Sequence, residues 1–267
     1  RPRAAAMANT ARGAGYESSF AYKTIKMRFL NIANIHAMRK SGKGLHAHAQ
    51  PGASDDNWFS VLGTWLGHIK LILSGALKII RYLEESTPVL LHCSDGWDRT
   101  PQLASLVQLM VDPYYRTIEG FIILIEKEWC SYGHKFADRC THYFTRTPSH
   151  SETSPVFVQF LDCIWQISQQ FPSAFEFNLK MLVFLSSHVY SGLYGTFLCN
   201  SPQERVEAGL VEKSVSIWSH ILDHVPQFSN PLYVSTDQVL RPLVSLKALQ
   251  LFKHIYFLYN PSLIQIP

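Results

Sequence analysis

Apolar residues recur at the spacing of an α-helix along most of the chain and at the spacing of a β-strand in two short segments. From Trp58 to Ile80 they recur every three or four residues, which predicts one long amphipathic helix. Residues 23–36 (KTIKMRFLNIANIH) show rough alternation of β-branched and aromatic residues, and residues 87–93 (TPVLLHC) form a short apolar run. Both patterns are typical of strands. Glycine and proline in residues 41–52 (SGKGLHAHAQPG) predict a loop.

Helical periodicity dominates the second half of the chain. Residues 145–155 (TRTPSHSETSP) are polar and predict a surface loop. Helices are predicted from Thr100-Pro101, over 118–129, from Ser154-Pro155, and over 178–190, 214–224 and 243–258. A few strands that feed a helix-rich second half indicate an α/β or α+β fold.

Composition indicates a folded chain with a sizeable core, since 47% of its 267 residues are hydrophobic and 16% are charged. Five scattered cysteines do not suggest a disulfide framework, which favours a reducing, cytoplasmic environment. The apolar residues 62–80 are interrupted by His68, Lys70 and Lys78, so no membrane span is expected. The first residues also lack the apolar run of a secretory signal.

Positive charge is concentrated near the start of the chain. Residues 1–43 contain nine lysines and arginines and one acid, Glu17, whereas the remaining residues contain 15 basic and 19 acidic side chains. A basic surface of this kind suits an anionic membrane or ligand, although an ordinary solvated surface explains the charge equally well.

The stretch LLHCSDGWDRTPQL, residues 90–103, joins the second predicted strand to the helix that follows it. It places Cys93, Gly96 and Arg99 in a Cys-x5-Arg spacing. A tight loop before a helix N-terminus directs backbone N–H groups at a bound anion. The same groups lower the pKa of a thiol. The stretch therefore predicts a phosphate-binding loop with a thiolate nucleophile.

The Cys-x5-Arg spacing alone is not specific, because it occurs three times. Cys140 and Arg146 enclose bulky aromatic residues and no glycine, and no helix start follows. Cys199 and Arg205 enclose Pro202, which has no N–H group, and no strand precedes them. Only residues 93–99 combine a strand, a glycine turn and a helix start.

Each polar residue of this loop has a predicted role. Cys93 would attack phosphorus to form a phosphocysteine intermediate, and Arg99 would bind two phosphate oxygens with its planar guanidinium. The Thr100 hydroxyl would assist the departure of sulfur in the second step. Asp98 or Asp95 would protonate the leaving alcohol, with helix capping as the alternative role. We favour catalysis for Asp98, and capping or loop hydrogen bonding for Asp95.

The sequence HCSDGWDRT resembles the signature of the myotubularin family of lipid phosphatases. The resemblance continues through DPYYRTIEGFIILIEKEW, GHKFADR, SPVFVQFLDCIWQISQQFPSAFEFN and GTFLCN, and it includes the opening RPRAAAMANTARGAGYE. It implies an α/β, tyrosine-phosphatase-like fold with a central mixed sheet flanked by helices and a helix-rich C-terminal half. It also implies that residues 1–267 form a phosphatase domain that lacks its N-terminal part and the pleckstrin-homology-like domain that precedes it in the family.

The same resemblance implies a function. Members remove the 3-phosphate from phosphatidylinositol 3-phosphate and phosphatidylinositol 3,5-bisphosphate, and they need no metal or other cofactor. Some members are inactive because the loop has lost its cysteine and arginine, but both residues are present here. We therefore expect a peripheral enzyme of endosomal membranes that contacts anionic lipid, pairs with itself or a related phosphatase, and has no nucleic-acid partner.

The resemblance also assigns substrate-binding residues. Lys135 stands where members often have arginine, and Ala5 where they usually have asparagine. Arg139 matches an arginine that contacts a headgroup phosphate. The residues expected to line the headgroup pocket are Asn9, Asn34, Ile35, Ser94, Asp95, Gly96, Trp97, Asp98, Arg99, Lys135 and Arg139.

Three alternatives compete with this interpretation. One is a protein tyrosine or dual-specificity phosphatase, which uses the same loop but usually takes its acid from a separate segment. Another is a catalytically impaired fragment that acts as an interaction module. The third is a zinc site at Cys130, His134, Cys140 and His142, although their spacing fits no common zinc pattern.

Overall fold

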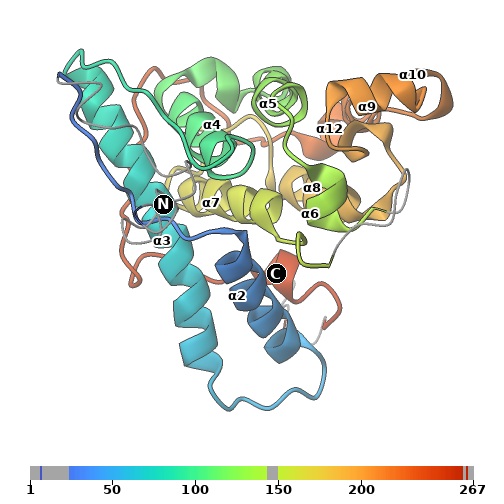
Figure 1. Cartoon of the computed structure of the whole chain (residues 1–267), viewed down its shortest axis with the longest axis horizontal. Coiled ribbons are helices and arrows are strands. Elements are labelled where there is room, and N and C mark those ends of the chain that lie inside the picture. The colour runs from blue at the N-terminus through green and yellow to red at the C-terminus, as the bar shows by residue number, and fades with distance from the viewer. Residues whose placement is uncertain (1–6, 8–23, 143–149, 261–262, 264–267) are drawn as a thin grey trace.

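The computed structural model describes Met7, residues 24–142, residues 150–260 and Leu263, and its regular structure is helical (Figure 1). Most of the predicted helices are confirmed, within a few residues at each end. The elements are α2 (Ile35–Ala49), α3 (Trp58–Glu84), α4 (Arg99–Val111), the 3-10 turn η1 (Pro113–Arg116), α5 (Ile118–Ile125), the π-helical turn η2 (Glu126–Ser131), α6 (Phe136–Cys140), α7 (Val156–Gln170), α8 (Leu179–Ser191), η3 (Gly195–Phe197), α9 (Pro202–Glu207), α10 (Leu210–Lys213), α11 (Ile217–Asp223), α12 (Val225–Phe228) and α13 (Lys253–Tyr256).

The predicted α/β fold with a central mixed sheet is wrong. Within the described residues the only β-pairings are two isolated bridges, Phe177 with Ser229 and Tyr194 with Val215. Residues 25–34 and 87–93 run without helical or strand structure. An apolar pattern of strand type specifies which side chains face inward, but a strand exists only where a partner backbone accepts its hydrogen bonds.

The predicted loop at residues 41–52 is also wrong in its first part, because α2 continues to Ala49. Glycine costs a helix roughly 1 kcal/mol relative to alanine. Packing offsets that cost: Leu45 is fully buried, and a Cβ atom at Gly42 would lie 2.9 Å from Cγ of Pro155. Gly42 is therefore a point of close helix approach, which a sequence pattern cannot distinguish from a turn.

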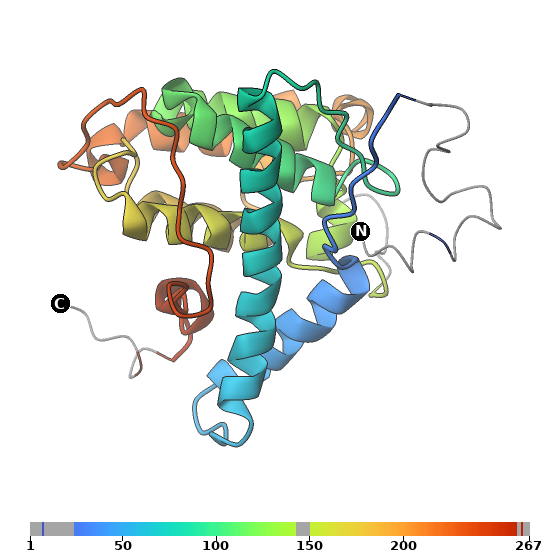
Figure 2. The ribbon, with the colours of Figure 1, turned by 90° about the vertical axis from the view of Figure 1, so that its left-hand side faces the viewer.

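α3 is the long helix predicted from Trp58, and it crosses the molecule beside α2, α4 and α7 (Figure 2). Trp65, Ile69 and Leu73 form part of its fully buried face. Among the described helices, only α3 has the length and composition that would suffice to cross a membrane. In this structure that apolar face packs against the neighbouring helices and forms part of the core.

A cluster of aromatic rings joins the helices that surround residues 93–99. Trp129 contacts Phe157 edge-on at 5.0 Å and Phe160 at 4.9 Å, both distances between ring centroids. Its indole N–H donates a hydrogen bond to Oγ of Ser105 in α4 at 3.0 Å. Aromatic pairs bury apolar area and also restrict the orientation of the rings. A buried indole N–H with a hydrogen-bond acceptor restricts it further. The cluster therefore holds η2, α4 and α7 together.

The predicted helix over residues 243–258 forms only at its end, as α13. Residues 240–252 follow α7 instead, and two glutamines of α7 take the place of helical hydrogen bonds. Gln170 binds both the N–H and the carbonyl of Leu243, and Gln166 binds both groups of Gln250. A backbone whose polar groups are satisfied in this way has no need to form helical hydrogen bonds.

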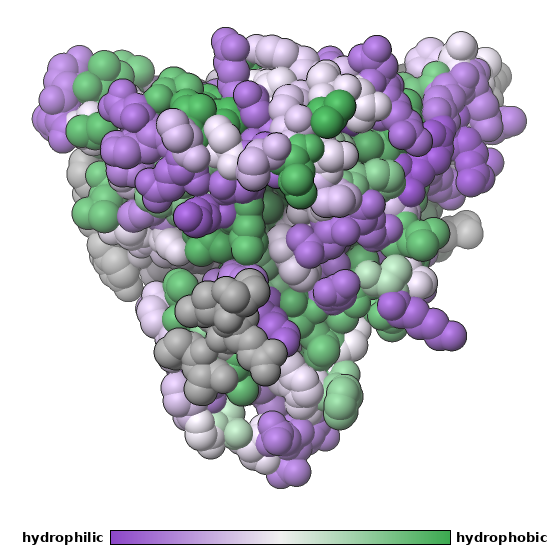
Figure 3. Space-filling model, turned by 180° about the vertical axis from the view of Figure 1, so that it is seen from behind, coloured by the Kyte–Doolittle hydropathy of each residue, from purple (hydrophilic) through white to green (hydrophobic). Residues whose placement is uncertain are grey.

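The molecular surface mixes hydrophilic and hydrophobic side chains (Figure 3). Several large hydrophobic residues are exposed, among them Phe59 at the start of α3 and Val211 in α10. Residues 150–155 of the predicted polar loop are not helical, and the rest of that loop, with Arg146, lies outside the described residues.

Candidate active site

Residues 93–98 form the predicted loop between an extended segment and the N-terminus of α4. Cys93 is buried, with 7% of its surface exposed, and α4 begins at Arg99. Gly96 has a φ of +94°, a backbone conformation that glycine adopts without a steric penalty. The extended segment, the glycine turn and the helix start therefore occur in the predicted order, although the extended segment is not a strand.

Cys93 is surrounded by groups that stabilise its thiolate. Burial raises the pKa of this thiol, but the Thr100 hydroxyl, the backbone N–H groups of Gly96 and Asp95 and the charge of Arg99 outweigh burial and lower it. The N–H of Gly96 donates to Sγ of Cys93 at 3.2 Å. Hydrogen-bond donors and positive charge favour the anionic form of sulfur, which is the nucleophilic form.

The other four cysteines have the opposite environment. Burial raises the pKa of Cys130, Cys140, Cys163 and Cys199. All five thiols are free, and Cys93 is the only one whose pKa is lowered. The structure thus separates Cys93 from the other cysteines on physical grounds.

The Arg99 side chain binds the loop at Ser94 and a separate segment at Ile32. One guanidinium nitrogen donates to Oγ of Ser94 at 3.2 Å, and the other donates to the carbonyl of Ile32 at 3.4 Å. The second bond connects the loop to the segment that leads into α2. A bound phosphate would offer these donors stronger, charged acceptors.

Asp98 binds Arg139 through both carboxylate oxygens. Nε of Arg139 donates to Oδ1 at 2.8 Å and Nη2 donates to Oδ2 at 2.9 Å. Arg139 also binds the carboxylate and the carbonyl of Glu152, and both Asp98 and Arg139 are buried. Asp98 occupies the N-cap position of α4, but its side chain makes no capping hydrogen bond. Its geometry is therefore that of a buried, bidentate ion pair.

Lys135 contacts Trp97, which is itself a residue of the loop. The ammonium nitrogen of Lys135 lies 4.2 Å from the centroid of the Trp97 ring, a cation–π contact, and 4.0 Å from a carboxylate oxygen of Asp138. Ser94 and Asp95 are exposed beside them. α6 and its N-cap residue Lys135 thus bring two basic side chains, Lys135 and Arg139, to the loop, although these residues follow it by about forty positions in the sequence.

The remaining predicted site residues have mixed placements. Asn34 caps α2, because its Oδ1 accepts a hydrogen bond from the N–H of Ala37 at 3.1 Å. Ile35 is half-buried, and its carbonyl accepts a hydrogen bond from the hydroxyl of Ser154. Both follow the segment that Arg99 binds at Ile32. Asn9, like Ala5, lies outside the described residues.

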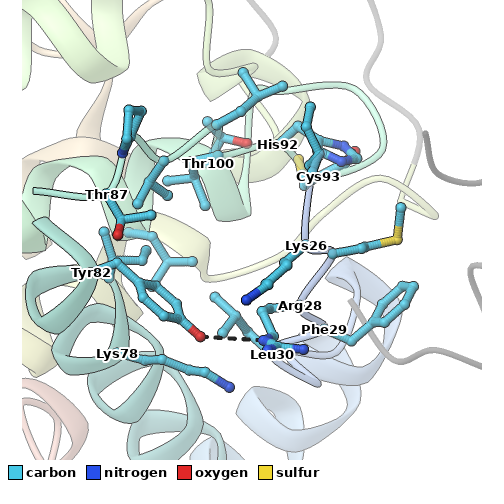
Figure 4. Close-up of a pocket in the computed structure, with 18 of the residues that line it drawn as sticks. Lys26, Arg28, Phe29, Leu30, Lys78, Tyr82, Thr87, His92, Cys93 and Thr100 are labelled. Carbon is cyan, nitrogen blue, oxygen red and sulfur yellow. Dashed lines mark hydrogen bonds between the residues drawn. The ribbon is translucent and has the colours of Figure 1, made fainter. Parts of the chain in front are cut away.

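A cavity of about 680 Å³ is lined in part by Cys93, Arg99 and Thr100, at the loop and the start of α4 (Figure 4). Its other walls come from residues 24–32, from α3 and from residues 87–92. Arg28 donates a hydrogen bond across it to the hydroxyl of Tyr82 at 3.3 Å. The extended segments that were predicted to be strands therefore border an open space rather than a packed sheet.

Two residues that touch the loop network were not predicted as part of the site. Glu152 binds Arg139, and His134 binds the carbonyl of Trp97. Glu152 lies in a stretch that reads only as a polar loop. His134 precedes Lys135 in the motif GHKFADR, which was the one available signal for it.

The zinc alternative finds no support in the geometry. His134 and His142 direct ring nitrogens at the carbonyls of Trp97 and Val189, and Cys130 lies near the carbonyl of Thr196. In the part of the chain that the structure describes, no three histidine, cysteine or acidic side chains are grouped so that they could hold a metal ion.

Comparison with known proteins agrees with the loop chemistry. Residues 1–206 match the model of the myotubularin-like phosphatase domain. Phosphatidylinositol-3,5-bisphosphate 3-phosphatase MTMR2 from Gallus gallus is 49% identical over 267 residues, which cover 98% of this chain and 47% of the relative. The protein of the same name from Mus musculus is 49% identical, covering 98% and 41%, and myotubularin from Xenopus tropicalis is 44% identical, covering 99% and 44%. The chain spans less than half the length of these relatives, and it belongs to the myotubularin family.

Proposed function

We propose that this chain carries the catalytic loop of a phosphoinositide 3-phosphatase. The observation that carries the proposal is the environment of Cys93, whose pKa is lowered by Thr100, Gly96, Asp95 and Arg99 against the effect of burial. The names of the MTMR2 relatives supply the substrate class: a phosphatidylinositol bisphosphate that loses its 3-phosphate.

The proposed reaction has two steps. The Cys93 thiolate attacks the phosphorus of the 3-phosphate, so that a sulfur–phosphorus bond forms and the bond to the inositol oxygen breaks. The leaving oxygen takes a proton from Asp98. A water molecule, which gives its proton to Asp98, then attacks the phosphocysteine; inorganic phosphate leaves and the thiolate returns. Arg99 and the loop N–H groups stabilise the charge on the phosphoryl oxygens in both steps.

The ion pair constrains the proposed role of Asp98. Both of its carboxylate oxygens bind Arg139, at 2.8 and 2.9 Å. To protonate the leaving group, Asp98 must itself carry a proton, so one of these oxygens must separate from Arg139, take up a proton from water and turn toward the substrate. The alternative is that Asp98 acts only by holding Arg139 near the loop.

We further propose that α2 contacts an anionic membrane. His36, Lys40 and Lys43 are exposed at spacings of four and three residues, which places them on one face of the helix. α2 and the adjoining end of α3 project from the other helices (Figure 2). Lysines such as Lys40 and Lys43 contribute about 1 kcal/mol each near an anionic bilayer, and salt weakens that attraction. Endosomal location and pairing with a related phosphatase remain expectations from the family.

A substrate panel tests the proposal. Phosphate release is measured with short-chain phosphatidylinositol 3-phosphate, the 3,5-bisphosphate, their 4- and 5-monophosphate isomers and a phosphotyrosine peptide. We expect kcat/KM to be highest for the two lipids that carry a 3-phosphate. A higher value for the peptide would favour the tyrosine phosphatase, and no release from any substrate would favour the interaction module.

The acid role of Asp98 is tested with two leaving groups. An inositol alkoxide needs a proton, whereas an activated phenolate scarcely does. Asp98→Asn should lose on the order of a hundredfold on the lipid and much less on an aryl phosphate. Asp95→Asn, the matched control in the same loop, should affect both substrates alike. Equal losses in Asp98→Asn, with the fold intact, would assign Asp98 to structure.

A further inference from the structure

His134 is a buried histidine whose position is fixed from several sides. None of its surface is exposed. Its N–H donates to the carbonyl of Trp129 at 2.9 Å, and its own carbonyl accepts from the N–H of Phe136 at 2.8 Å. Its ring lies edge-on to Trp129 and Phe136, with centroid distances of 4.8 and 4.7 Å. The imidazole therefore has one orientation, set by the aromatic cluster.

The hydrogen bonds of this ring determine where its proton resides. Nδ1 lies 2.5 Å from the carbonyl oxygen of Trp97, and a carbonyl can only accept a hydrogen bond. Nδ1 must therefore carry the proton. Nε2 is buried and has no hydrogen-bond partner among the described residues, so a second proton there would be unsatisfied. Burial agrees with this assignment, because it lowers the pKa of His134 to about 4 against the attraction of Asp98.

The contact with Trp97 has a consequence for the loop. The carbonyl of Trp97 and the N–H of Asp98 belong to one planar trans peptide and point in opposite directions. A bond that holds the carbonyl against His134 thus turns the N–H of Asp98 away from His134. A loop that binds phosphate needs its carbonyls directed outward and its N–H groups directed at the anion. The Asp98 carboxylate, which pairs with Arg139, lies 3.6 Å from Nδ1 of His134.

We propose that His134 is a positioning residue for the reaction: its neutral imidazole, protonated at Nδ1, fixes the peptide between Trp97 and Asp98 and thereby the shape of the phosphate-binding loop. This role rests on the proposed function of the loop as a phosphate site. It does not require His134 to touch the substrate. It predicts that kcat and the affinity of the loop for a phosphate-like anion depend more on the Nδ1–H donor than on the size of the ring.

Two substitutions separate the donor from the ring. His134→Phe keeps a ring against Trp129 and Phe136 but removes the donor. His134→Asn loses the ring but places an amide N–H close to the position of Nδ1. His142→Phe is the matched control, because His142 is also buried and directs a ring nitrogen at a carbonyl, that of Val189, at 2.7 Å.

Two readouts report on the loop. The first is kcat and KM for short-chain phosphatidylinositol 3-phosphate, and the second is the affinity for orthovanadate, which mimics the phosphoryl group on a thiolate. His134→Phe should lower kcat and vanadate affinity by on the order of 10–100-fold with a smaller change in KM. His134→Asn should recover most of both, and His142→Phe should change neither, even if it is less stable.

Vanadate binding also separates this proposal from the proposed function. If the wild-type chain hydrolyses no phosphoinositide, the proposed substrate is wrong, and the vanadate affinities of the variants still test His134. Wild-type affinity for vanadate in His134→Phe would overturn the positioning role, as would equal losses in His134→Phe and His142→Phe. If His134→Phe does not fold, ¹⁵N spectra of histidine-labelled wild-type protein decide: His134 protonated at Nε2 would contradict the proposal.

Discussion

The two flanks of the loop at residues 93–98, the proposed catalytic loop, differ in how they are held. On the α4 flank, Leu106 and Met110 are fully buried, and the helix packs against α3 and α7. On the other flank, the extended flank, residues 87–92 and 25–32 have no helical or strand structure and border the cavity of about 680 Å³, and Leu90 is 76% exposed. The loop therefore takes its shape from the helices behind it rather than from the segment that leads into it.

This difference also indicates where the loop is adjustable. His134 and Arg139 fix residues 97 and 98 from α6 and the turn that precedes it. The extended flank is tied to the loop through the Arg99 contact with Ile32, at 3.4 Å. Regions with few buried apolar contacts open at a lower free energy than the packed core. We expect opening motions to begin on the extended flank.

Of the two flanks, the α4 flank should give the larger effect on stability. Leu106 is 0% exposed, so Leu106→Ala should reduce the free energy of unfolding by about 2–5 kcal/mol, from lost burial and the cavity it leaves. Leu91, half-buried beside the open cavity, offers the same substitution on the other flank. Leu91→Ala should cost about 1 kcal/mol.

Urea denaturation of the two variants measures this contrast directly. The difference between them is more informative than either value, because the side chains removed are identical. Equal losses, or a larger loss in Leu91→Ala, would mean that the extended flank is packed as tightly as the helical one.

The sequence predicted the helices better than the extended flank for a physical reason. A helix such as α3 makes its hydrogen bonds within one segment, so the spacing of Trp65, Ile69 and Leu73 is enough to predict it. Residues 25–34 and 87–93 have an apolar pattern of strand type. That pattern does not indicate whether another strand lies beside them to accept their hydrogen bonds. Tertiary contacts also reversed two predictions: Gly42 packs on Pro155 in a helix, and the glutamines of α7 bind the backbone of Leu243 and Gln250, where a helix was expected.

The catalytic loop was predictable because its chemistry is local. Cys93, Gly96 and Arg99 lie within seven residues, and the structure gives Cys93 the lowered pKa that their arrangement implies. The partners of Asp98 were not predictable in the same way. The contact of Arg139 with a headgroup phosphate stays a prediction, whereas its pairing with Asp98 was not predicted. Glu152 has no sequence feature that marks it as a loop contact, and the only signal for His134 is its place in the motif GHKFADR.

An intermediate effect should appear in the pH dependence of stability. His134 has a pKa of about 4 in the folded protein and about 6.5 when unfolded, so it takes up a proton on unfolding below pH 6.5. Stability is lost as the pH falls from 6.5 toward 4. Between pH 7 and pH 5 wild-type protein should therefore lose about 2 kcal/mol more than His134→Asn. Identical losses in urea titrations at the two pH values would show that His134 is not buried in its neutral form.

The smallest effect should come from an exposed ion pair at the C-terminal end of α3. Arg241 and Glu84 form a salt bridge with side chains 53% and 44% exposed, in contrast to the buried pair of Arg139 and Asp98. Arg241→Ala should change the free energy of unfolding by less than about 1 kcal/mol, because solvent screens an exposed pair. Arg139→Ala leaves Asp98 buried without its partner and should cost about 3–5 kcal/mol. Similar values for the two variants in thermal or urea unfolding would show that burial does not distinguish these pairs.

The proposed reaction requires Cys93 to become phosphorylated during turnover. Wild-type protein is mixed with short-chain phosphatidylinositol 3-phosphate, quenched in acid within the first turnover and digested for mass spectrometry. We predict one phosphoryl group on the peptide that contains Cys93 and none on the peptides of the other cysteines. Cys93→Ser should release no phosphate, whereas Cys140→Ser should turn over normally. Continued phosphate release in Cys93→Ser, or turnover by wild-type protein without a phosphorylated Cys93, would contradict the phosphocysteine mechanism.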